Sequence, residues 1–488
     1  MKRTTVLTLL LAVVAAGCVR DLPAPPLHEL RVAAPDEWTG GDLATVGRDS
    51  PWWTYFNADD LGRTIVEALE RNHDLRAAAA RIEIAVADAT IAGAPLLPNV
   101  DVSVNRSQQR QNFIGFPFPG GEGSVLSTTS TNYGIRLNAS WEPDLWGRIR
   151  IGELAAVTNA RIRYADLAAA ELSLTGQVAK AWFATVEAQR QVDLARASLE
   201  SFRVSAERVR ARFQSGLRPS LDLRLALTEV FRAEAAIEQR IEQRERAVRG
   251  LEALMGRYPA GDYVLGSDLP LVPDEVPGGL PSELVHRRPD LLAAELSVLA
   301  ADTRLAEAET ALRPSFSLTS GTGTASGNLI DLLNHNLFIW NFAANLVYPL
   351  FNNGRLNAAV LRNESQVAEA LANYESRILE AYREVESTLA AEEVLLRRER
   401  ALQEAVVQSV AAQALAEQRY RLGLTDIITV LSAQRIAYSS ESQLLGIRRT
   451  RLDNRVDLHL ALGGGFASAD VPSEDAARGR GAESGGGS

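Results

Sequence analysis

Apolar and polar positions follow two periods along the chain, and each period predicts one kind of element. Early in each half, apolar residues recur at every third or fourth position, which is typical of a helix that buries one face. Pro98 and Pro314 end this pattern, because proline cannot continue a helix, and alternation of apolar and polar residues follows. Val100, Val102 and Val104, for example, are separated by polar residues. The pattern therefore predicts strand pairs that come directly after helices.

Unusually long helical patterns follow the strand pairs. Residues 148–215 and 355–422 contain no proline and would each extend roughly 100 Å at about 1.5 Å per residue. Apolar residues in the first keep the alternating three-and-four spacing of a coiled-coil seam. Gly216 and Gly423 are expected to end these helices. The chain then turns back, so each half is expected to close with an antiparallel helical pair.

The chain contains the same plan twice. Residues 74–78 recur at 290–294, an offset of 216 residues, and residues 212–217 recur at 419–424, an offset of 207. The difference falls in a Gly/Pro/Phe-rich loop between the first two strands, at residues 113–127. A repeat of this length predicts two copies of one supersecondary unit.

The expected organisation can be given by residue ranges. The chain is expected to begin with a signal peptide (1–17) and a lipidated N-terminal segment (18–58), to have a linker between the repeats (257–281) and to end in a disordered tail (464–488). The first repeat (59–256) is expected to contain an opening helix at 59–94, a β-hairpin at 99–141, a long helix at 148–215 and a return helix at 220–255. The second repeat (282–463) is expected to contain an opening helix at 282–312, a β-hairpin at 315–350, a long helix at 355–422 and a return helix at 426–462.

The first residues have the pattern of an export signal. Lys2 and Arg3 precede the apolar run 6–16, which is too short to cross a bilayer as a helix. Small residues lead to Cys18, the only cysteine, and this arrangement is similar to a bacterial lipobox. We expect Cys18 to carry covalent lipid that tethers the chain to a membrane. The alternative is an ordinary signal peptide with an incidental cysteine.

Composition limits the chemistry that the chain can perform. A formal net charge of −10 argues against nucleic-acid binding. One cysteine, five histidines and two methionines make a metal site improbable, so no metal and no cofactor other than the lipid is expected. No nucleophile elbow, zinc-protease helix or P-loop is present, and the Gly321–Gly327 run leads to another strand rather than to a phosphate-binding helix. The chain is therefore not expected to be an enzyme and has no expected catalytic residues.

The four strands predicted per chain are too few to form a closed β-barrel from a single copy. Strands of about 9 to 11 tilted residues can cross a bilayer. Single-chain barrels begin at about eight strands, and open sheet edges in hydrocarbon leave backbone groups unpaired. If the predicted strands of this chain lie in the membrane, several copies must therefore share one closed wall.

At this point the sequence resembles the TolC-like family of outer-membrane efflux proteins, and in particular its lipoprotein branch, which serves tripartite pumps. The resemblance covers about Trp52 to Gly463 and rests on seven motifs in order: Trp52-Trp53, Asn72-His73-Asp74-Leu75, the 141–148 run WEPDLWGR, Arg287-Arg288-Pro289-Asp290, the 349–355 run PLFNNGR, and the paired turns at Gly216 and Gly423. It implies an α+β membrane protein in which three copies form a twelve-stranded β-barrel that continues as a periplasmic α-helical coiled-coil barrel.

The resemblance also implies partners and functional positions. A homotrimer in the outer membrane would contact lipid, a periplasmic adaptor protein and an inner-membrane transporter of the RND type. The tip residues Gly216, Leu217, Gly423 and Leu424 correspond to adaptor contacts. Asp222, Tyr420, Thr425 and Asp426 correspond to candidates for the periplasmic gate. Both glycines are also explained as plain helix C-caps, and both aspartates as solvated charges at helix N-termini.

The resulting prediction is a passive outer-membrane channel of a tripartite efflux system for small hydrophobic or amphiphilic compounds. A channel of a type I protein-secretion system, from the same family, is the nearest alternative. A periplasmic coiled-coil adaptor is the alternative from another class, although an adaptor would show a β-rich module around one hairpin instead of two copies of helix, strand pair and long helix.

Overall fold

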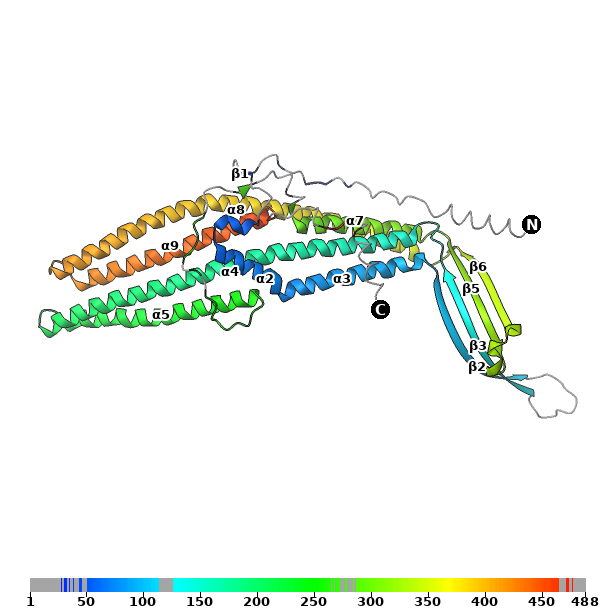
Figure 1. Cartoon of the computed structure of the whole chain (residues 1–488). Helices are drawn as coiled ribbons and strands as arrows, with labels where there is room; N and C mark the ends of the chain where they lie inside the picture. Colours follow the sequence, from blue (N-terminus) through cyan, green and yellow to red (C-terminus); the bar gives the residue numbers. More distant parts are fainter. Residues whose placement is uncertain are drawn as a thin grey trace.

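The computed structural model describes residues 51–113, 126–264 and 287–464 almost continuously, together with some positions in 28–45, 266–284 and 471–476. The described chain is elongated (Figure 1). A four-stranded sheet lies at one end, two helical hairpins form the other end, and long helices connect them. Among the described helices, none is long and apolar enough to cross a membrane.

From α3 in the first repeat and α7 in the second, the two repeats contain corresponding elements in the same order. The first has α2 (Asp59–Arg71), α3 (His73–Gly93), β2 (Asn99–Phe113), β3 (Leu126–Trp141), α4 (Arg148–Gln214) and α5 (Ser220–Leu254). The second has α7 (Pro289–Thr310), β5 (Ser315–Ser326), β6 (Phe338–Val347), α8 (Arg355–Arg421) and α9 (Ile427–Ala461). The short elements include four 3-10 helices, η1 (Trp52–Phe56), η2 (Ala94–Leu96), η3 (Leu329–Leu333) and η4 (His335–Leu337). Two short strands, β1 (Ala44–Thr45) and β4 (Pro277–Gly278), pair in parallel.

The single opening helix expected at 59–94 is wrong, because the chain breaks at Asn72. Its backbone is extended, and its side-chain oxygen accepts hydrogen bonds from the backbone N–H groups of Asp74 (2.8 Å) and Leu75 (3.2 Å). Its amide nitrogen donates to the Leu254 carbonyl at 3.0 Å. Asparagine competes with helical hydrogen bonds in this way and favours helix N-caps. α2 and α3 are therefore separate helices.

The opening helix expected at 282–312 also breaks, because Leu284 and Arg287 are helical but Arg288 is extended. α7 begins at Pro289, with Arg288 extended as its N-cap. Proline is favoured at the first helical position, because the N–H that it lacks would have no partner inside the helix. Pro289 corresponds to His73 at the 216-residue offset, so both repeats begin this helix at equivalent positions.

The sheet is antiparallel throughout, in the order β2-β3-β5-β6. β3 and β5 join the two repeats, with Trp141 opposite Leu318 and Tyr133 opposite Ser326. Within the described part of the chain, the outer strands β2 and β6 each pair on one side only. The loop residues 114–125, which fall in the Gly/Pro/Phe-rich loop, lie outside the described residues.

The helices pack around α4. It contacts α3 and α5 of its own repeat and α7 and α9 of the second, whereas α8 contacts chiefly α7 and α9. The largest described core lies midway along the bundle, where η1 and α2 pack on α4, α5 and α9. Its largest side chains include Trp52, Phe56, Trp182, Phe183 and Met255. A second core, which includes Phe202, Val209, Tyr420 and Ile427, lies between the helical hairpins near their tips.

The segment after α5 is held by a buried carboxylate. The Glu252 side chain is 1% exposed and accepts hydrogen bonds from the backbone N–H groups of Gly261 (2.7 Å), Asp262 (3.0 Å) and Tyr263 (3.0 Å). Burial raises the pKa of this carboxyl, but the hydrogen bonds to its charged form outweigh burial, so the pKa lies below its ordinary value. One charged side chain thus fixes the start of the linker between the repeats.

The tail expected to be disordered at 464–488 contains at least one buried position. Val471 is 8% exposed and packs with Ala165 of α4 and Ala293 of α7. Most of the remaining tail lies outside the described residues, as does Cys18. The sequence reading missed the Val471 contact because one apolar residue in a polar segment carries no periodic signal.

Candidate functional site

The sheet separates apolar from polar residues on its two faces. Val102 lies opposite Leu137, Leu137 opposite Thr322, and Thr322 opposite Trp340, so these four residues form one row on one face. In a strand, successive side chains point to opposite faces. The neighbouring row on the other face contains Asp101, Asn138, Gly321 and Asn341. Each face of this sheet therefore has its own chemistry.

Hydrogen bonds organise the polar face. The Asn138 amide donates to Asp101 at 2.9 Å and to the Ser103 hydroxyl at 3.2 Å. A side chain at Gly321 would approach the Asn341 side-chain oxygen to 2.5 Å, so glycine leaves room for the amides on both sides. The result is a face of amides and hydroxyls that can stay hydrated.

The apolar face is uncovered in a single chain. Its exposed apolar side chains on the two outer strands are Val100, Val102, Val104, Phe338, Trp340, Phe342 and Leu346. An apolar surface of this extent marks a contact with a membrane or with other protein. It continues to both outer strands, whose free edges carry unpaired backbone groups.

The predicted tip glycines end both long helices with the same geometry. Gly216 has φ +74° and Gly423 has φ +76°, a left-handed conformation that side chains other than glycine rarely adopt. The Leu217 N–H donates to the Arg212 carbonyl at 2.9 Å, and the Leu424 N–H donates to the Arg419 carbonyl at 2.9 Å. Both turns are therefore Schellman caps. Both glycines are thus explained as helix C-caps, and this explanation is compatible with a contact between the same residues and an adaptor.

The leucines after these glycines point outward. Leu217 is 72% exposed and Leu424 is 62% exposed, and Leu422 beside them is 67% exposed. A cap stabilises the helix end through its backbone, so it does not require these apolar side chains to face water. The two tips therefore present apolar side chains at the end of the bundle furthest from the sheet (Figure 1).

The four gate candidates lie near the tips, in different environments. Tyr420 is buried, at 3% exposed, in the core between the hairpins. Asp426 caps α9 by accepting from the Thr429 N–H (2.8 Å) and hydroxyl (2.7 Å), and these hydrogen bonds lower the pKa of its carboxyl. Asp222 lies in the first turn of α5, and Thr425 lies between Gly423 and α9. Asp426 therefore serves as the N-cap of α9, and a role in gating would come in addition to this structural role.

A residue that the sequence reading missed connects the two tips. Arg212, near the end of α4, donates to the carbonyls of Tyr420 and Arg421 at 3.0 Å each. Its guanidinium carbon also lies 4.5 Å from the centre of the Tyr420 ring. We call this set of contacts the Arg212 clasp. It satisfies carbonyls at the end of α8 and covers an aromatic ring, both of which favour a cation. The sequence signal was the repeated Arg-aromatic pair at 212–213 and 419–420.

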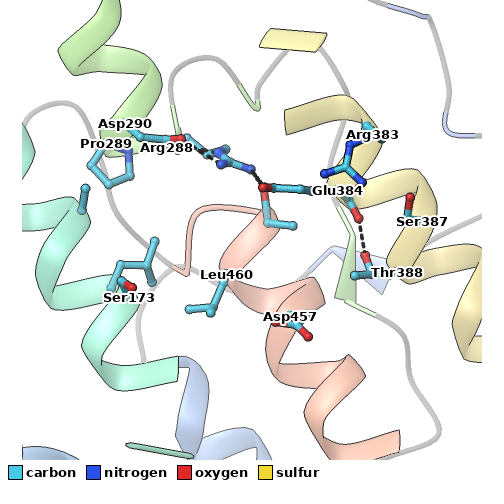
Figure 2. A pocket seen from close by; sticks show the side chains of 13 residues that line it. Ser173, Arg288, Pro289, Asp290, Arg383, Glu384, Ser387, Thr388, Asp457 and Leu460 are labelled. Atoms are coloured by element: carbon cyan, nitrogen blue, oxygen red, sulfur yellow. Dashed lines mark hydrogen bonds and ion pairs between the residues drawn. The ribbon is translucent and has the colours of Figure 1, made fainter. Parts of the chain in front are cut away.

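A cavity of about 440 Å³ lies where α4, α7, α8 and α9 meet (Figure 2). Arg288 donates to Asp290 at 2.8 Å and to Glu384 at 2.6 Å. Burial raises the pKa of Asp290, but Arg288 outweighs it, so this pKa lies below its ordinary value. Asp457 on the same wall forms an ion pair with Lys180. The Arg288–Glu384 pair joins the start of α7 to α8, and the Asp457–Lys180 pair joins α9 to α4, so these charged groups around the cavity are paired with one another. Among the described residues, no cluster of acidic, histidine or cysteine side chains could hold a metal.

Comparison with known proteins gives matches along most of the chain. The family model described as Outer membrane efflux protein matches residues 64–257 and 280–464. The chain is 32% identical over 461 residues to the pyoverdine export outer membrane protein OpmQ of Pseudomonas putida, covering 92% of this chain and 95% of that protein. It is 33% identical over 416 residues to the toluene efflux pump outer membrane protein TtgI of Pseudomonas putida, covering 85% and 87%.

A solved structure extends the likeness to three dimensions. The open state of the MtrE outer membrane channel of Neisseria gonorrhoeae matches with a TM-score of 0.79 and 29% identity. The match covers 92% of this chain and 99% of that one. It therefore includes both the sheet and the helical hairpins.

Proposed function

The chain belongs to the outer membrane efflux protein family, and from that premise we propose that three copies form a passive channel for small hydrophobic or amphiphilic compounds. The protein is an outer-membrane channel component of an efflux system, with its helices extending into the periplasm. The number of copies, the cargo and the individual partners are the proposed part.

The four-stranded sheet with two free edges is the observation that carries this proposal. Among the described strands, β2 and β6 each lack a neighbour on one side, and one face of the sheet is apolar and exposed. Unpaired backbone groups in hydrocarbon each cost several kcal/mol, so the edges must pair with other copies. Three copies would supply twelve strands in one closed wall. The apolar face would meet lipid, and the face with Asp101, Asn138 and Asn341 would line water.

Transport through such a wall requires no chemical step. The amide- and hydroxyl-rich face offers hydrogen bonds to a passing solute, and it carries charges of both signs, on Asp101, which accepts from Asn138, and on Arg136. Solute would move down its gradient, and an inner-membrane partner would supply energy. We therefore propose that the protein acts without catalysis.

The cargo class follows from the relatives by analogy. OpmQ is named for pyoverdine export and TtgI for toluene efflux. Both names refer to small molecules, which favours small-molecule efflux over the protein-secretion alternative. We propose the same broad class here.

Partners and attachment complete the proposal. The exposed Leu217 and Leu424 at the tips would contact a periplasmic adaptor, together with Gly216 and Gly423. An RND-type transporter in the inner membrane would drive the adaptor-bound channel. Residues 1–17 would be removed as a signal peptide, and lipid on Cys18 would anchor the segment 18–58 to the outer membrane. Asp222, Tyr420, Thr425 and Asp426 would lie at the periplasmic gate.

Dye accumulation in cells tests the function. Cells that lack this chain should accumulate a hydrophobic fluorescent dye, and expression of the wild-type chain should lower the accumulation severalfold. Unchanged accumulation, with the wild-type protein present in the outer membrane and its pump expressed, would contradict the proposal.

The tip assignment has a sharper test. Gly423→Trp should abolish dye efflux and leave the amount of trimer in the outer membrane unchanged, because no atom of the described residues lies within 4 Å of a Cβ at this position and the indole would project toward the adaptor. Gly423→Ala brings a similar backbone strain at φ +76° without the bulk, so it serves as the control and should retain efflux. Loss of the trimer in Gly423→Trp alone would contradict the tip assignment.

A further inference from the structure

The Arg212 clasp joins the two repeats within one chain, and its three contacts are specific. The guanidinium donates to two carbonyls of the last turn of α8, those of Tyr420 and Arg421, at 3.0 Å each. It also lies 4.5 Å from the Tyr420 ring centre. Arginine is suited to this arrangement, because its planar fork can donate to two acceptors while it stacks on an aromatic face.

The internal repeat places the same residues on the opposite helices. At the 207-residue offset, Arg212 of α4 corresponds to Arg419 of α8, and Tyr420 of α8 corresponds to Phe213 of α4. Both helices end in the same Schellman cap, so the equivalent carbonyls have the same orientation at each tip. A second clasp therefore has all of its chemical parts, namely an arginine, an aromatic ring and the last-turn carbonyls of Phe213 and Gln214.

The parts of this second clasp are uncovered in one chain. Tyr420 is 3% exposed, because it packs in the core between the hairpins and lies under Arg212 and Arg218, whereas its counterpart Phe213 is 40% exposed. Arg419 is exposed, and among the described residues its side chain makes no hydrogen bond or ion pair. The contact that covers the aromatic ring in the first case is therefore unmade in the second.

We propose that Arg419 of each copy clasps Phe213 of the partner subunit and the last-turn carbonyls beside it. This inference rests on the proposed trimer, in which the second repeat of one chain meets the first repeat of the next. Three clasps within chains would then alternate with three clasps between chains, closing a ring of six arginine–aromatic contacts at the periplasmic tip. The occupant of the exposed Phe213 surface is thus a second copy of this chain.

Crosslinking in the intact outer membrane tests the pairing. Full-length protein with Phe213→Cys and Arg419→Cys is treated with a short bismaleimide and analysed on denaturing gels after boiling. Covalent dimers and trimers are expected, since the two thiols of a clasp lie on different chains. Each single variant should remain monomeric, and these variants also report any reaction at Cys18.

The intrachain clasp provides the matched control. Arg212→Cys with Tyr420→Cys places the same two thiols on one chain, so the same reagent should leave this variant monomeric on the boiled gel. A crosslinked trimer from Phe213→Cys with Arg419→Cys, together with a monomer from the control pair, supports the proposal.

Closure of the tip gives a second measurement, the resting current of purified channels in planar lipid. Arg419→Ala and Phe213→Ala should each raise the resting current by at least about fivefold. The double variant should raise it no further than either single variant, because both changes break the same contact. Phe213→Tyr should keep the wild-type current, since tyrosine occupies the equivalent position in the second repeat. Arg421→Ala is the control, because the side chain of Arg421 has no role in either clasp.

The outcomes separate this inference from the proposed function. If unboiled gels show trimer but the cysteine pair yields only monomer, the interchain clasp is wrong and the channel proposal stands. If the two alanine variants raise the current additively, the pairing is also wrong. If no variant and no wild-type sample forms a trimer or a pore, the proposed function itself fails.

Discussion

At the scale of single residues, one carboxylate holds the start of the linker in place through hydrogen bonds. Glu252 accepts three backbone N–H groups, from Gly261 to Tyr263, and it is buried. Glu252→Gln keeps the shape but removes the charge and one acceptor, so it should lower the free energy of unfolding by about 1–3 kcal/mol at pH 7. Glu238→Gln, on an exposed face of the same helix, is the control and should have no measurable effect.

The same residue predicts a pH dependence with a definite sign. The pKa of Glu252 is lowered in the folded state, so its contribution is fully present above the unfolded pKa of about 4.3. The contribution is lost as the pH falls through the lower folded pKa. Thermal melts at pH 7 and at successively lower pH should therefore show a gap between wild type and Glu252→Gln that narrows below about pH 4. A gap that widens on acidification would contradict the assignment.

At the scale of elements, the joint between the repeats depends on a close approach of two strands. A side chain at Gly323 of β5 would lie 2.0 Å from the Ile135 carbonyl oxygen of β3, so the backbone would have to move. Gly327, just beyond β5, has its nearest atom at 3.7 Å. Gly323→Ala should cost more than the about 1–3 kcal/mol of an overpacked core and should prevent trimer formation, whereas Gly327→Ala should not.

Gel migration checks this prediction directly. Outer-membrane fractions are run with and without boiling, and the heat-labile trimer band should be absent for Gly323→Ala and present for Gly327→Ala. Equal trimer bands for the two variants would show that the β3–β5 joint tolerates displacement.

The helices and strands also show which parts of the fold could be predicted from the sequence and which could not. The long helices and the strands were predictable because uninterrupted periodicity extends over many residues, and the predicted range 148–215 differs from α4 by one residue. The break at Asn72 was missed because helical periodicity continues on both sides, and only the Asn-His-Asp capping pattern indicates it. The break at Arg288 is likewise invisible to periodicity, and only the preference of proline for the first helical position indicates that a helix begins at Pro289.

The candidate site was predictable only in part, for a physical reason. Gly216 and Gly423 are local signals, because a left-handed C-cap depends on one residue. The Arg212 clasp joins residues about two hundred positions apart, and neither periodicity nor a motif reports a contact at that distance. The internal repeat was the available signal, since it places an arginine before an aromatic residue at both helix ends.

At the scale of the whole molecule, the uncovered surfaces share one explanation. The free edges of β2 and β6, the exposed apolar face of the sheet and the exposed Phe213 would all find partners if three copies closed one tube. The repeat makes this arrangement regular, because the contact that joins the repeats within a chain would recur between chains.

The most direct test measures the mass and the conductance of one purified sample. Wild-type protein in detergent should have three times the mass of one chain after correction for bound detergent, and the same fraction should form discrete conducting pores in planar lipid. A monomeric mass with no conductance, in protein whose secondary structure is intact, would contradict the claim that several copies share one membrane-crossing wall.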